Sequence, residues 1–214
     1  MKINYQKTKI LPFNFTKKSD FLPQLSFPGG EPLEVIYSTR RLGVIISSDL
    51  SWSTHVNDIV LRAVKKLWIL IRFKSLGATT EQLLQVFFTR VRSTLEIAAP
   101  VFHGGLKKLQ SNQLEIVQKK ASAIILAQSY TNYETALLSL NMERLDNRRE
   151  KLCLSYAIKC TKSHRHQSMF IPSPSHMYNT RNFKTYMEPL CNTSRYYNSS
   201  IPYLTRLLNK TEKK

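Results

Sequence analysis

Basic side chains are the residues whose type and spacing in this sequence most directly suggest a chemistry. The chain has 32 Lys and Arg residues against 14 Asp and Glu residues, which gives a formal net charge of +18. A folded chain with this excess repels itself unless a polyanion or counterions screen the charge. Ammonium and guanidinium groups bind phosphates, and such contacts position a nucleic-acid duplex without reading its sequence. The composition therefore favours nucleic acid as the partner, with a membrane-surface protein or a subunit of a ribosome-like assembly as alternatives.

Many of these cations lie on segments with helical periodicity. The densest group is at residues 144 to 151, and Glu143 and Glu150 offset only part of its positive charge. For any one cation, a solvated helix face is the alternative to a phosphate contact. The candidate phosphate-binding residues on these segments are Lys65, Lys66, Arg72, Lys74, Arg90, Arg92, Lys119, Lys120, Arg144, Arg148, Arg149 and Lys151.

Carboxylates with the spacing of a catalytic centre are missing from the sequence. The four aspartates are isolated, and no Asp-Asp or Asp-Glu dipeptide occurs; they are Asp20, Asp49, Asp58 and Asp146. Nucleotide polymerisation needs carboxylates that hold two Mg²⁺ ions beside the primer and the nucleotide phosphates. No Gly-rich phosphate loop or nucleophilic triad stands out either. We therefore expect no catalytic residues.

Histidines and cysteines do not indicate a metal site. His164 and His166 lack a third ligand at matching spacing, so we expect no zinc and no other bound metal. The three cysteines include no C-x-x-C pair and are expected to be reduced thiols inside a cell. His55 and His103 are expected to be structural, and Trp52 is expected in the core because it falls on the apolar stripe of its helix.

Four or five helices must position the cations. From residue 51 the apolar residues recur every three or four positions, which predicts a long amphipathic helix that Gly77 ends. Thr79 and Gln82 form a capping box that opens a second helix, and Pro100 is expected to end it. Further helices are predicted at residues 111–128, at 133–138 with Asn132 as cap, and at 142–162. Short loops between them predict an antiparallel bundle.

The buried stripes follow from the same periodicity. The first helix is expected to bury Trp52, Val56, Ile59, Val60, Ala63, Leu67, Leu70 and Ile71. The second is expected to bury Leu83, Leu84, Phe87, Phe88, Val91 and Leu95. The third is expected to bury Leu114, Val117, Ala121, Ile124 and Ile125, and the last Leu145, Leu152, Tyr156 and Cys160.

The two ends of the chain differ from this helical middle. Residues 1–50 are β-like, with short strands expected at 8–15, 35–37 and 42–46, and they make a small sheet rather than a domain. Pro12 argues for an edge position of the first strand. Residues 163–214 form a basic tail expected to pack loosely, although residues 201–208 have a helical apolar face and can dock on the bundle. The predicted regions are therefore 1–50, 51–162 and 163–214.

Several sequence blocks resemble, in their order, the end of the reverse transcriptase of non-LTR (LINE-like) retrotransposons. The first is Arg41-Leu42-Gly43-Val44-Ile45-Ile46, followed by Asp49-Leu50-Ser51-Trp52-Ser53-Thr54-His55-Val56. Then come Arg92-Ser93-Thr94-Leu95-Glu96-Ile97-Ala98-Ala99-Pro100-Val101-Phe102-His103, Leu114-Glu115-Ile116-Val117-Gln118-Lys119-Lys120-Ala121, Tyr133-Glu134-Thr135-Ala136-Leu137 and Leu145-Asp146-Asn147-Arg148-Arg149-Glu150-Lys151-Leu152. The tail blocks Tyr178-Asn179-Thr180-Arg181, Cys191-Asn192-Thr193-Ser194-Arg195-Tyr196 and Ser200-Ile201-Pro202-Tyr203 also resemble this family, so the similarity covers nearly the whole chain.

The resemblance implies a fold that is mainly α: a small β remnant of the palm, a thumb-like bundle of four or five helices, and the tail. It also implies that Lys7 and Lys9 belong to the lysine-bearing motif after the catalytic aspartates. Gly43 would lie in the hairpin that grips the primer end, where a glycine lets the backbone approach nucleic acid closely. Arg40 and Arg41 stand where the family commonly has an aromatic residue and a lysine, which keeps the positive charge but changes the grip.

In that family the Mg²⁺-binding aspartates lie upstream, so we expect no cofactor in this chain and no polymerisation by it alone. The expected partner is RNA, DNA or an RNA–DNA hybrid, together with the upstream polymerase region. The chain looks like a truncated or mis-delimited copy of such an element, inside the cell in nucleus or cytoplasm, with no membrane span. The alternative is a non-enzymatic basic helical module that binds RNA or protein.

Overall fold

The computed structural model describes Asn4 and residues 7–13, 25–26, 30, 32–174 and 184–211. The chain divides into two compact units, Met1–Asp58 and Ile59–Lys214, and the boundary falls inside the first helix, α1 (Ser53–Ser75). The expectation of a mainly helical protein with a small amount of strand is confirmed. Among the described residues, no helix has both the length and the apolar character needed to cross a bilayer.

The described residues of the first unit form two small two-stranded sheets rather than one. Strands β1 (Lys9–Ile10) and β2 (Glu34–Val35) pair in parallel, and β3 (Ser38–Arg41) and β4 (Val44–Ser47) form an antiparallel hairpin. The hairpin turn consists of Leu42 and Gly43, both with positive φ (48° and 85°). This geometry matches the right-handed twist of paired strands. The strand predicted at 42–46 therefore starts at Val44, and Leu42 is fully exposed. Residues 14 and 15 of the strand predicted at 8–15 lie outside the described residues.

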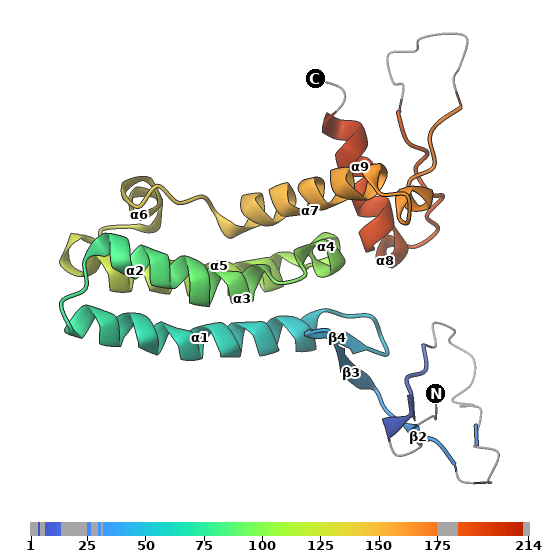
Figure 1. The fold of residues 1–214 in the computed structure, drawn as a ribbon, viewed down its shortest axis with the longest axis horizontal. Helices are drawn as coiled ribbons and strands as arrows, with labels where there is room; N and C mark the ends of the chain where they lie inside the picture. The colour runs from blue at the N-terminus through green and yellow to red at the C-terminus, as the bar shows by residue number, and fades with distance from the viewer. Residues whose placement is uncertain are drawn as a thin grey trace. The chain divides into compact units, whose positions relative to one another are not determined.

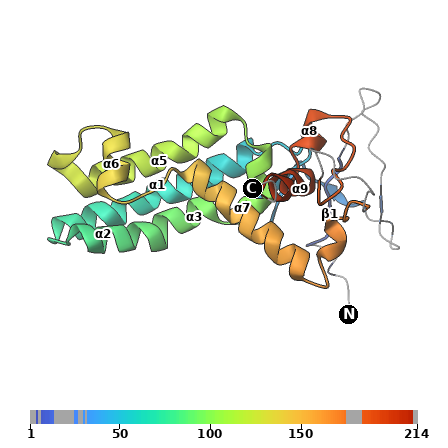
Figure 2. The ribbon, with the colours of Figure 1, turned by 90° about the horizontal axis from the view of Figure 1, so that it is seen from above.

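The second unit is a helical bundle, shown in Figures 1 and 2. After α1 come α2 (Thr80–Val86), the π-helix η2 (Phe87–Arg92), α3 (Ser93–Glu96), α4 (Ala99–Phe102), the 3₁₀ turn η3 (His103–Gly105), α5 (Lys108–Leu126) and the 3₁₀ turn η4 (Ala127–Ser129). The chain continues through α6 (Tyr133–Ser139), α7 (Leu145–Lys162), the 3₁₀ turn η5 (Gln167–Met169), α8 (Ser194–Tyr197) and α9 (Ser200–Thr211). The predicted helices are thus all present, with ends shifted by a few residues.

The signals for helix ends are confirmed at three places. Gly77 follows α1 with φ 82° and its N–H donates to the Lys74 carbonyl at 3.0 Å. The Thr79 hydroxyl accepts from the Gln82 N–H at 3.3 Å, and the Gln82 side chain accepts from the Thr79 N–H at 2.9 Å. Asn132 caps α6 by accepting from the Thr135 N–H at 2.9 Å. The local sequence therefore decided where these helices start and stop.

Pro100 starts a helix instead of ending one, which corrects the sequence prediction. The second predicted helix passes through the π-helix η2 and already ends at Glu96, and Ala98 then takes a left-handed conformation with φ 56°. Pro100 is in the first turn of α4. A proline fits there because the first turn of a helix has no intrahelical acceptor for its N–H groups.

The buried faces of α1 and α7 also differ in part from the predicted stripes. Ile71 is 49% exposed and Tyr156 is 43% exposed, whereas Leu152 and Trp52 are only half-buried. In α7 the buried line is shifted by one residue and passes through an arginine; it consists of Leu145, Arg149, Cys153, Ala157 and Cys160. The spacing of four is the same as in an apolar stripe, but one position carries a guanidinium.

Helix α9 packs against α7, η3 and α4, so the predicted return of residues 201–208 as a docked helix is confirmed. Figures 1 and 2 both place α9 beside α7. The shared core contains Cys153, Ala157, Cys160, Phe170, Leu204, Leu207 and Leu208. Asn209 fixes the preceding segment, because its side chain accepts from the Tyr186 N–H at 2.9 Å and donates to the Tyr186 carbonyl at 3.0 Å. The tail is therefore packed more firmly than expected in these parts.

Loss of the capping box should weaken the α1–α2 turn. We expect Thr79→Ala to lower the free energy of unfolding by about 1 kcal/mol. The Gln82 N–H loses the Thr79 hydroxyl as its acceptor, and the Gln82 side chain is no longer held in place to accept from the N–H of residue 79. Thr80→Ala is the matched control, since Thr80 is exposed and makes no cap hydrogen bond in the described structure. Urea denaturation measures both changes, and equal effects of the two substitutions would contradict the capping role.

Candidate nucleic-acid interface and the buried polar cluster

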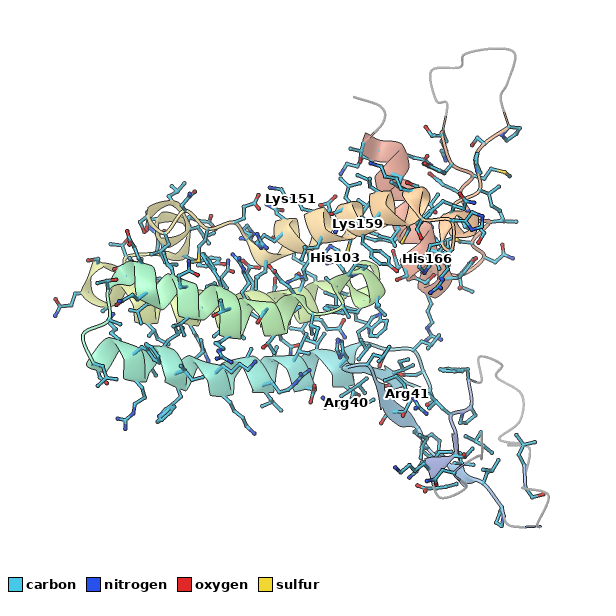
Figure 3. The ribbon with its side chains drawn as sticks, viewed as in Figure 1. Arg40, Arg41, His103, Lys151, Lys159 and His166 are labelled. Carbon is cyan, nitrogen blue, oxygen red and sulfur yellow. The ribbon has the colours of Figure 1, made fainter. Side chains whose placement is uncertain are left out.

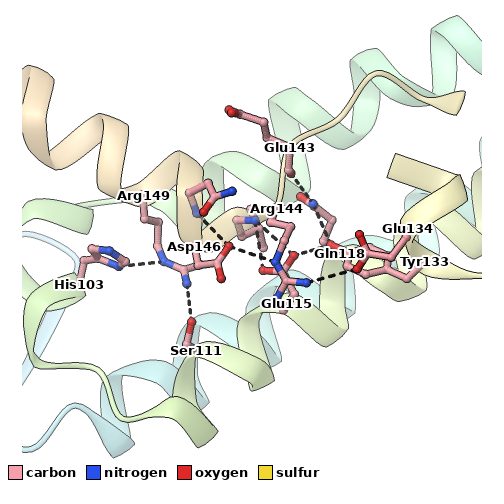
Figure 4. Close-up of polar contacts among 12 residues, drawn as sticks. His103, Ser111, Glu115, Gln118, Tyr133, Glu134, Glu143, Arg144, Asp146 and Arg149 are labelled. Carbon is pink, nitrogen blue, oxygen red and sulfur yellow. Dashed lines mark hydrogen bonds and ion pairs between the residues drawn. The ribbon is translucent and has the colours of Figure 1, made fainter. Parts of the chain in front are cut away.

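Arg149, predicted as a phosphate ligand, is fully buried in the second unit. Its Nε donates to His103 Nδ1 at 3.3 Å and its Nη2 donates to the Ser111 hydroxyl at 2.9 Å. These partners come from η3 and α5, so the guanidinium joins these two segments to α7 (Figure 4). A group with 0% exposure cannot reach a phosphate. The predicted contact is therefore wrong in this structure, and Arg149 is a structural residue.

His103 is held neutral by the same contact. Burial, followed by the nearby Arg149 charge, lowers the pKa of His103 from 6.5 to about 4. A neutral imidazole with its proton on Nε2 leaves Nδ1 free to accept from Arg149. Burial in turn lowers the pKa of Arg149 below its usual value, although Glu115 and Asp146 act in the opposite direction. The expectation that His103 is structural is confirmed.

A second group of buried polar side chains lies beside Arg149, on α5 and α6. Glu115 accepts from the Leu145 N–H, at 3.3 and 3.1 Å to its two oxygens, and from the Tyr133 hydroxyl. Gln118 donates to the Tyr133 hydroxyl at 3.0 Å and to the Glu143 carbonyl at 2.8 Å (Figure 4). Burial raises the pKa of Tyr133, and the hydrogen bond to Glu115 adds to this. Glu115 therefore occupies the N-terminus of α7, where an anion is favoured.

Arg148 is neutralised by Glu96 of α3. Arg148 Nε and Nη2 donate to the two Glu96 oxygens at 2.6 and 3.2 Å, a bidentate pair. Arg92 shares this carboxylate at 3.8 Å and stacks over the Phe88 ring at 3.9 Å. Bidentate pairs hold both partners in a fixed geometry. This arrangement directs the Arg148 guanidinium to α3.

The remaining cations of the 144–151 group also have acidic partners. Arg144 lies 3.5 Å from Glu134 and 3.4 Å from Asp146, and Lys151 pairs with Glu143. The densest basic group in the sequence is thus largely compensated inside the unit. The candidates for contact with an anion are therefore the exposed cations that have no carboxylate within ion-pair distance among the described residues.

Two of the four predicted cations on α1 are used in packing. Lys66 Nζ donates to the Thr94 hydroxyl at 2.6 Å, which joins α1 to α3. Lys74 Nζ donates to the carbonyls of Ile124 and, at 2.9 Å, Ile125 in the last turn of α5. A cation at a helix C-terminus is favoured by the helix dipole. These two lysines are therefore turned toward the bundle.

The other predicted cations of this unit face solvent. Lys65 and Arg72 are exposed on α1, Arg90 is exposed on η2, and Lys119 and Lys120 are exposed on α5. In the part of the chain that the structure describes, no carboxylate lies within ion-pair distance of these five side chains. They are the candidates for contact with an anionic partner.

In the first unit the predicted cations lie near the strands. Lys9 pairs with Glu34 at 2.8 Å across β1 and β2, and Arg40 pairs with Asp58 at 2.5 Å. Arg41, the next residue of β3, is exposed beside the hairpin turn (Figure 3). Lys7 is also exposed, and its backbone N–H donates to the Asn4 carbonyl and side chain, both at 3.2 Å.

The hairpin is fixed to the start of α1 by a buried histidine. His55 has 0% exposure, and its Nδ1 accepts from the Ile45 N–H of β4 at 3.3 Å. The predicted structural role of His55 is therefore confirmed. Gly43 has φ 85° at the tip of this hairpin, a conformation that glycine adopts without strain.

The sequence patterns did not indicate three polar side chains that join α3 and α5 to α6 and α7: Glu96, Glu115 and Gln118. Only helical periodicity indicated that Glu115 and Gln118 are buried, because they adjoin the buried Leu114 and Val117 on α5. Arg149 likewise follows Leu145 by four residues on the buried face of α7. A charged residue at such a position is ordinarily assigned to the surface.

Comparisons with known proteins find no similar protein. No protein-family model matches the chain, no curated protein matches it, and no solved structure matches it.

Removal of the buried guanidinium should destabilise the bundle. We expect Arg149→Ala to lower the free energy of unfolding by about 3–5 kcal/mol, because it empties a packed volume and leaves buried polar partners without a donor. Arg165→Ala is the control at an exposed position and should change the stability by less than about 0.5 kcal/mol. If Arg149→Ala instead has the melting temperature of the parent but a lower affinity for nucleic acid, Arg149 is the phosphate ligand that the sequence predicts.

Acid should destabilise the protein through His103. The unfolded chain protonates this histidine near pH 6.5, whereas the folded chain does so only near pH 4. Between these values the unfolded state binds more protons, so the free energy of unfolding falls as the pH drops from 6.5 to 4, by at most about 3 kcal/mol. His103→Asn keeps an acceptor for Arg149 and does not titrate. In urea denaturation from pH 7 to 4, the parent should therefore lose more of its free energy of unfolding than the variant does. Equal losses in the two proteins would refute the neutral histidine.

Proposed function

We propose that this chain holds duplex nucleic acid, such as a template–primer hybrid, through its phosphate backbone. It would do so as the thumb-like C-terminal part of a reverse transcriptase of a non-LTR retrotransposon. The observation that carries the proposal is the set of exposed cations on α1, η2 and α5 that no carboxylate compensates among the described residues. Contacts of this type position a duplex and supply sequence-independent affinity.

The distribution of acidic residues supports this proposal. In the second unit, Glu96, Glu134 and Glu143 pair with cations of α7, and Glu150 pairs with Lys210 of α9 at 3.6 Å. These four acids are thus engaged within the folded unit, whereas the exposed cations of α1, η2 and α5 have no ion-pair partner among the described residues, and the chain as a whole has a net charge of +18. An unscreened surplus of this size favours association with a polyanion.

The position of the buried cluster in the sequence is consistent with the proposed ancestry. Glu96 and His103 fall in one of the blocks that resemble the reverse transcriptases, and Glu115 falls in the next. Tyr133 and Arg149 fall in the two blocks after that. The blocks therefore coincide with the segments that the buried hydrogen bonds hold together. A set of buried polar groups that hydrogen-bond to one another restricts the residues allowed at each position.

We propose that the chain does not polymerise nucleotides by itself. Three of its aspartates have structural roles. Asp58 pairs with Arg40, Asp146 lies 3.4 Å from Arg144, and Asp49 accepts from the Ser51 N–H at 3.0 Å. Ion pairs and turn hydrogen bonds of this kind account for these carboxylates without a metal-binding role.

Salt dependence tests the proposal. We expect binding of an RNA–DNA primer–template duplex to weaken steeply with salt, by about 0.9 log units per log unit of salt for each phosphate contacted. Lys119→Ala/Lys120→Ala should reduce that slope by about two units if both lysines contact phosphates, and the melting temperature should not change. Fluorescence anisotropy of a labelled duplex across a salt series measures the slope.

Lys159→Ala/Lys162→Ala is the matched control, because it removes the same charge from exposed positions in the last turn of α7. Its slope should stay close to that of the parent. Equal slopes for the two double variants would mean that the charge acts without a defined interface, and a flat slope for the parent would exclude backbone binding.

A further inference from the structure

The outer face of α1 carries an apolar stripe that packing within the second unit leaves uncovered. Leu61 is 62% exposed, Val64 39%, Trp68 61% and Ile71 49%. The buried face of the helix is separate and contains Ile59, Ala63, Leu67 and Leu70. One helix therefore has two apolar faces, of which only one is used within this unit.

The spacing of the exposed residues is that of a coiled-coil seam. Leu61, Val64, Trp68 and Ile71 are separated by three, four and three residues, which is the a/d pattern of two heptads. Lys65 and Arg72 then fall on the e positions beside the seam, and both are exposed. Charges at e and g positions select the partner helix and its orientation.

The charges at the edge of the seam define the partner. The Arg72 guanidinium lies 5.2 Å from the centre of the Trp68 ring, over the seam. Lys65 and Arg72 have no carboxylate partner among the described side chains. A helix with acidic residues opposite them would form interhelical ion pairs while its apolar residues cover the stripe.

A second copy of this chain fits the surface poorly. In an antiparallel pair of α1 helices the e positions face each other, so Lys65 and Arg72 would meet cations of the other copy. A phosphate backbone would satisfy the two cations but would leave four large apolar side chains without cover. A membrane surface calls for a wider apolar face than a two-heptad seam provides.

We propose that the outer face of α1 binds an acidic amphipathic helix of a protein partner, through a short coiled-coil contact centred on Trp68. The contact takes Lys65 and Arg72 of α1 out of the set of cations proposed to bind phosphate, and the salt-slope test of that set uses only Lys119 and Lys120 of α5. The two-heptad seam is short, so affinity depends on the match of both the seam and the flanking charges.

Trp68 supplies a direct readout, since the other tryptophan, Trp52, can be replaced by phenylalanine. The probe is a synthetic three-heptad peptide with leucine at a and d and glutamate at e and g, and its control has lysine in place of glutamate. We expect the glutamate peptide to shift the Trp68 emission to shorter wavelength and to bind at least about tenfold tighter than the lysine peptide. Lys65→Glu/Arg72→Glu should reverse that preference.

Leu61→Asp gives a second test, because Leu61 is exposed and its change should leave the melting temperature unaltered. It should weaken binding of the glutamate peptide by about tenfold or more. The proposal is overturned if neither peptide shifts the emission, if charge reversal leaves the preference unchanged, or if the shift appears only with phosphatidylserine vesicles or with the RNA–DNA duplex. Dimerisation of the chain through the same face, detected by sedimentation and abolished by Leu61→Asp, would also overturn it. The salt-slope comparison of Lys119→Ala/Lys120→Ala with its control tests the α5 part of the phosphate interface and is interpreted separately from these outcomes.

Discussion

Burial of the Arg149 guanidinium is the constraint on which the second unit depends. The charge lies on the inner face of α7, so the segments around it must supply acceptors, and η3 and α5 do this through His103 and Ser111. The adjacent Gly104 extends the constraint to α9: a Cβ atom there would lie 2.6 Å from Cγ of Tyr203. A buried charge is stable only when hydrogen bonds replace its hydration. The close packing of α7, η3 and α9 provides that environment.

The same requirement decides where the excess charge of the chain is found. Glu96 is occupied by Arg148 and Arg92, and Glu115 is occupied by the start of α7 and the Tyr133 hydroxyl. Acids used in this way cannot offset cations on the outer helix faces. These two carboxylates are thus used inside the second unit, whereas Lys65, Arg72, Arg90, Lys119 and Lys120 on its surface have no ion-pair partner among the described residues. This separation supports the proposal that the surface binds a polyanion, and it assigns that role to lysines outside the 144–151 group.

Cations that lie close together in the sequence of helix α1 have different roles. Its residues at intervals of three and four serve two separate faces, one that packs in the unit and one that faces solvent. Lys66 and Lys74 belong to the first face because they bond to α3 and to the end of α5. Lys65 and Arg72 border the second. Neighbouring cations on one helix therefore differ in function because of a rotation of about 100° per residue.

The sequence by itself determined the elements: the helical periods, the capping residues Thr79 and Asn132, the stop at Gly77 and the helical return near residue 204. These follow from local hydrogen bonding and from apolar spacing, which need no distant partner. Tertiary structure alone decided the burial of Arg149, the helix start at Pro100 and the division of the α1 cations. Each of these depends on which residues, far apart in the chain, provide an acceptor or cover a face, and composition and period contain no information about that pairing.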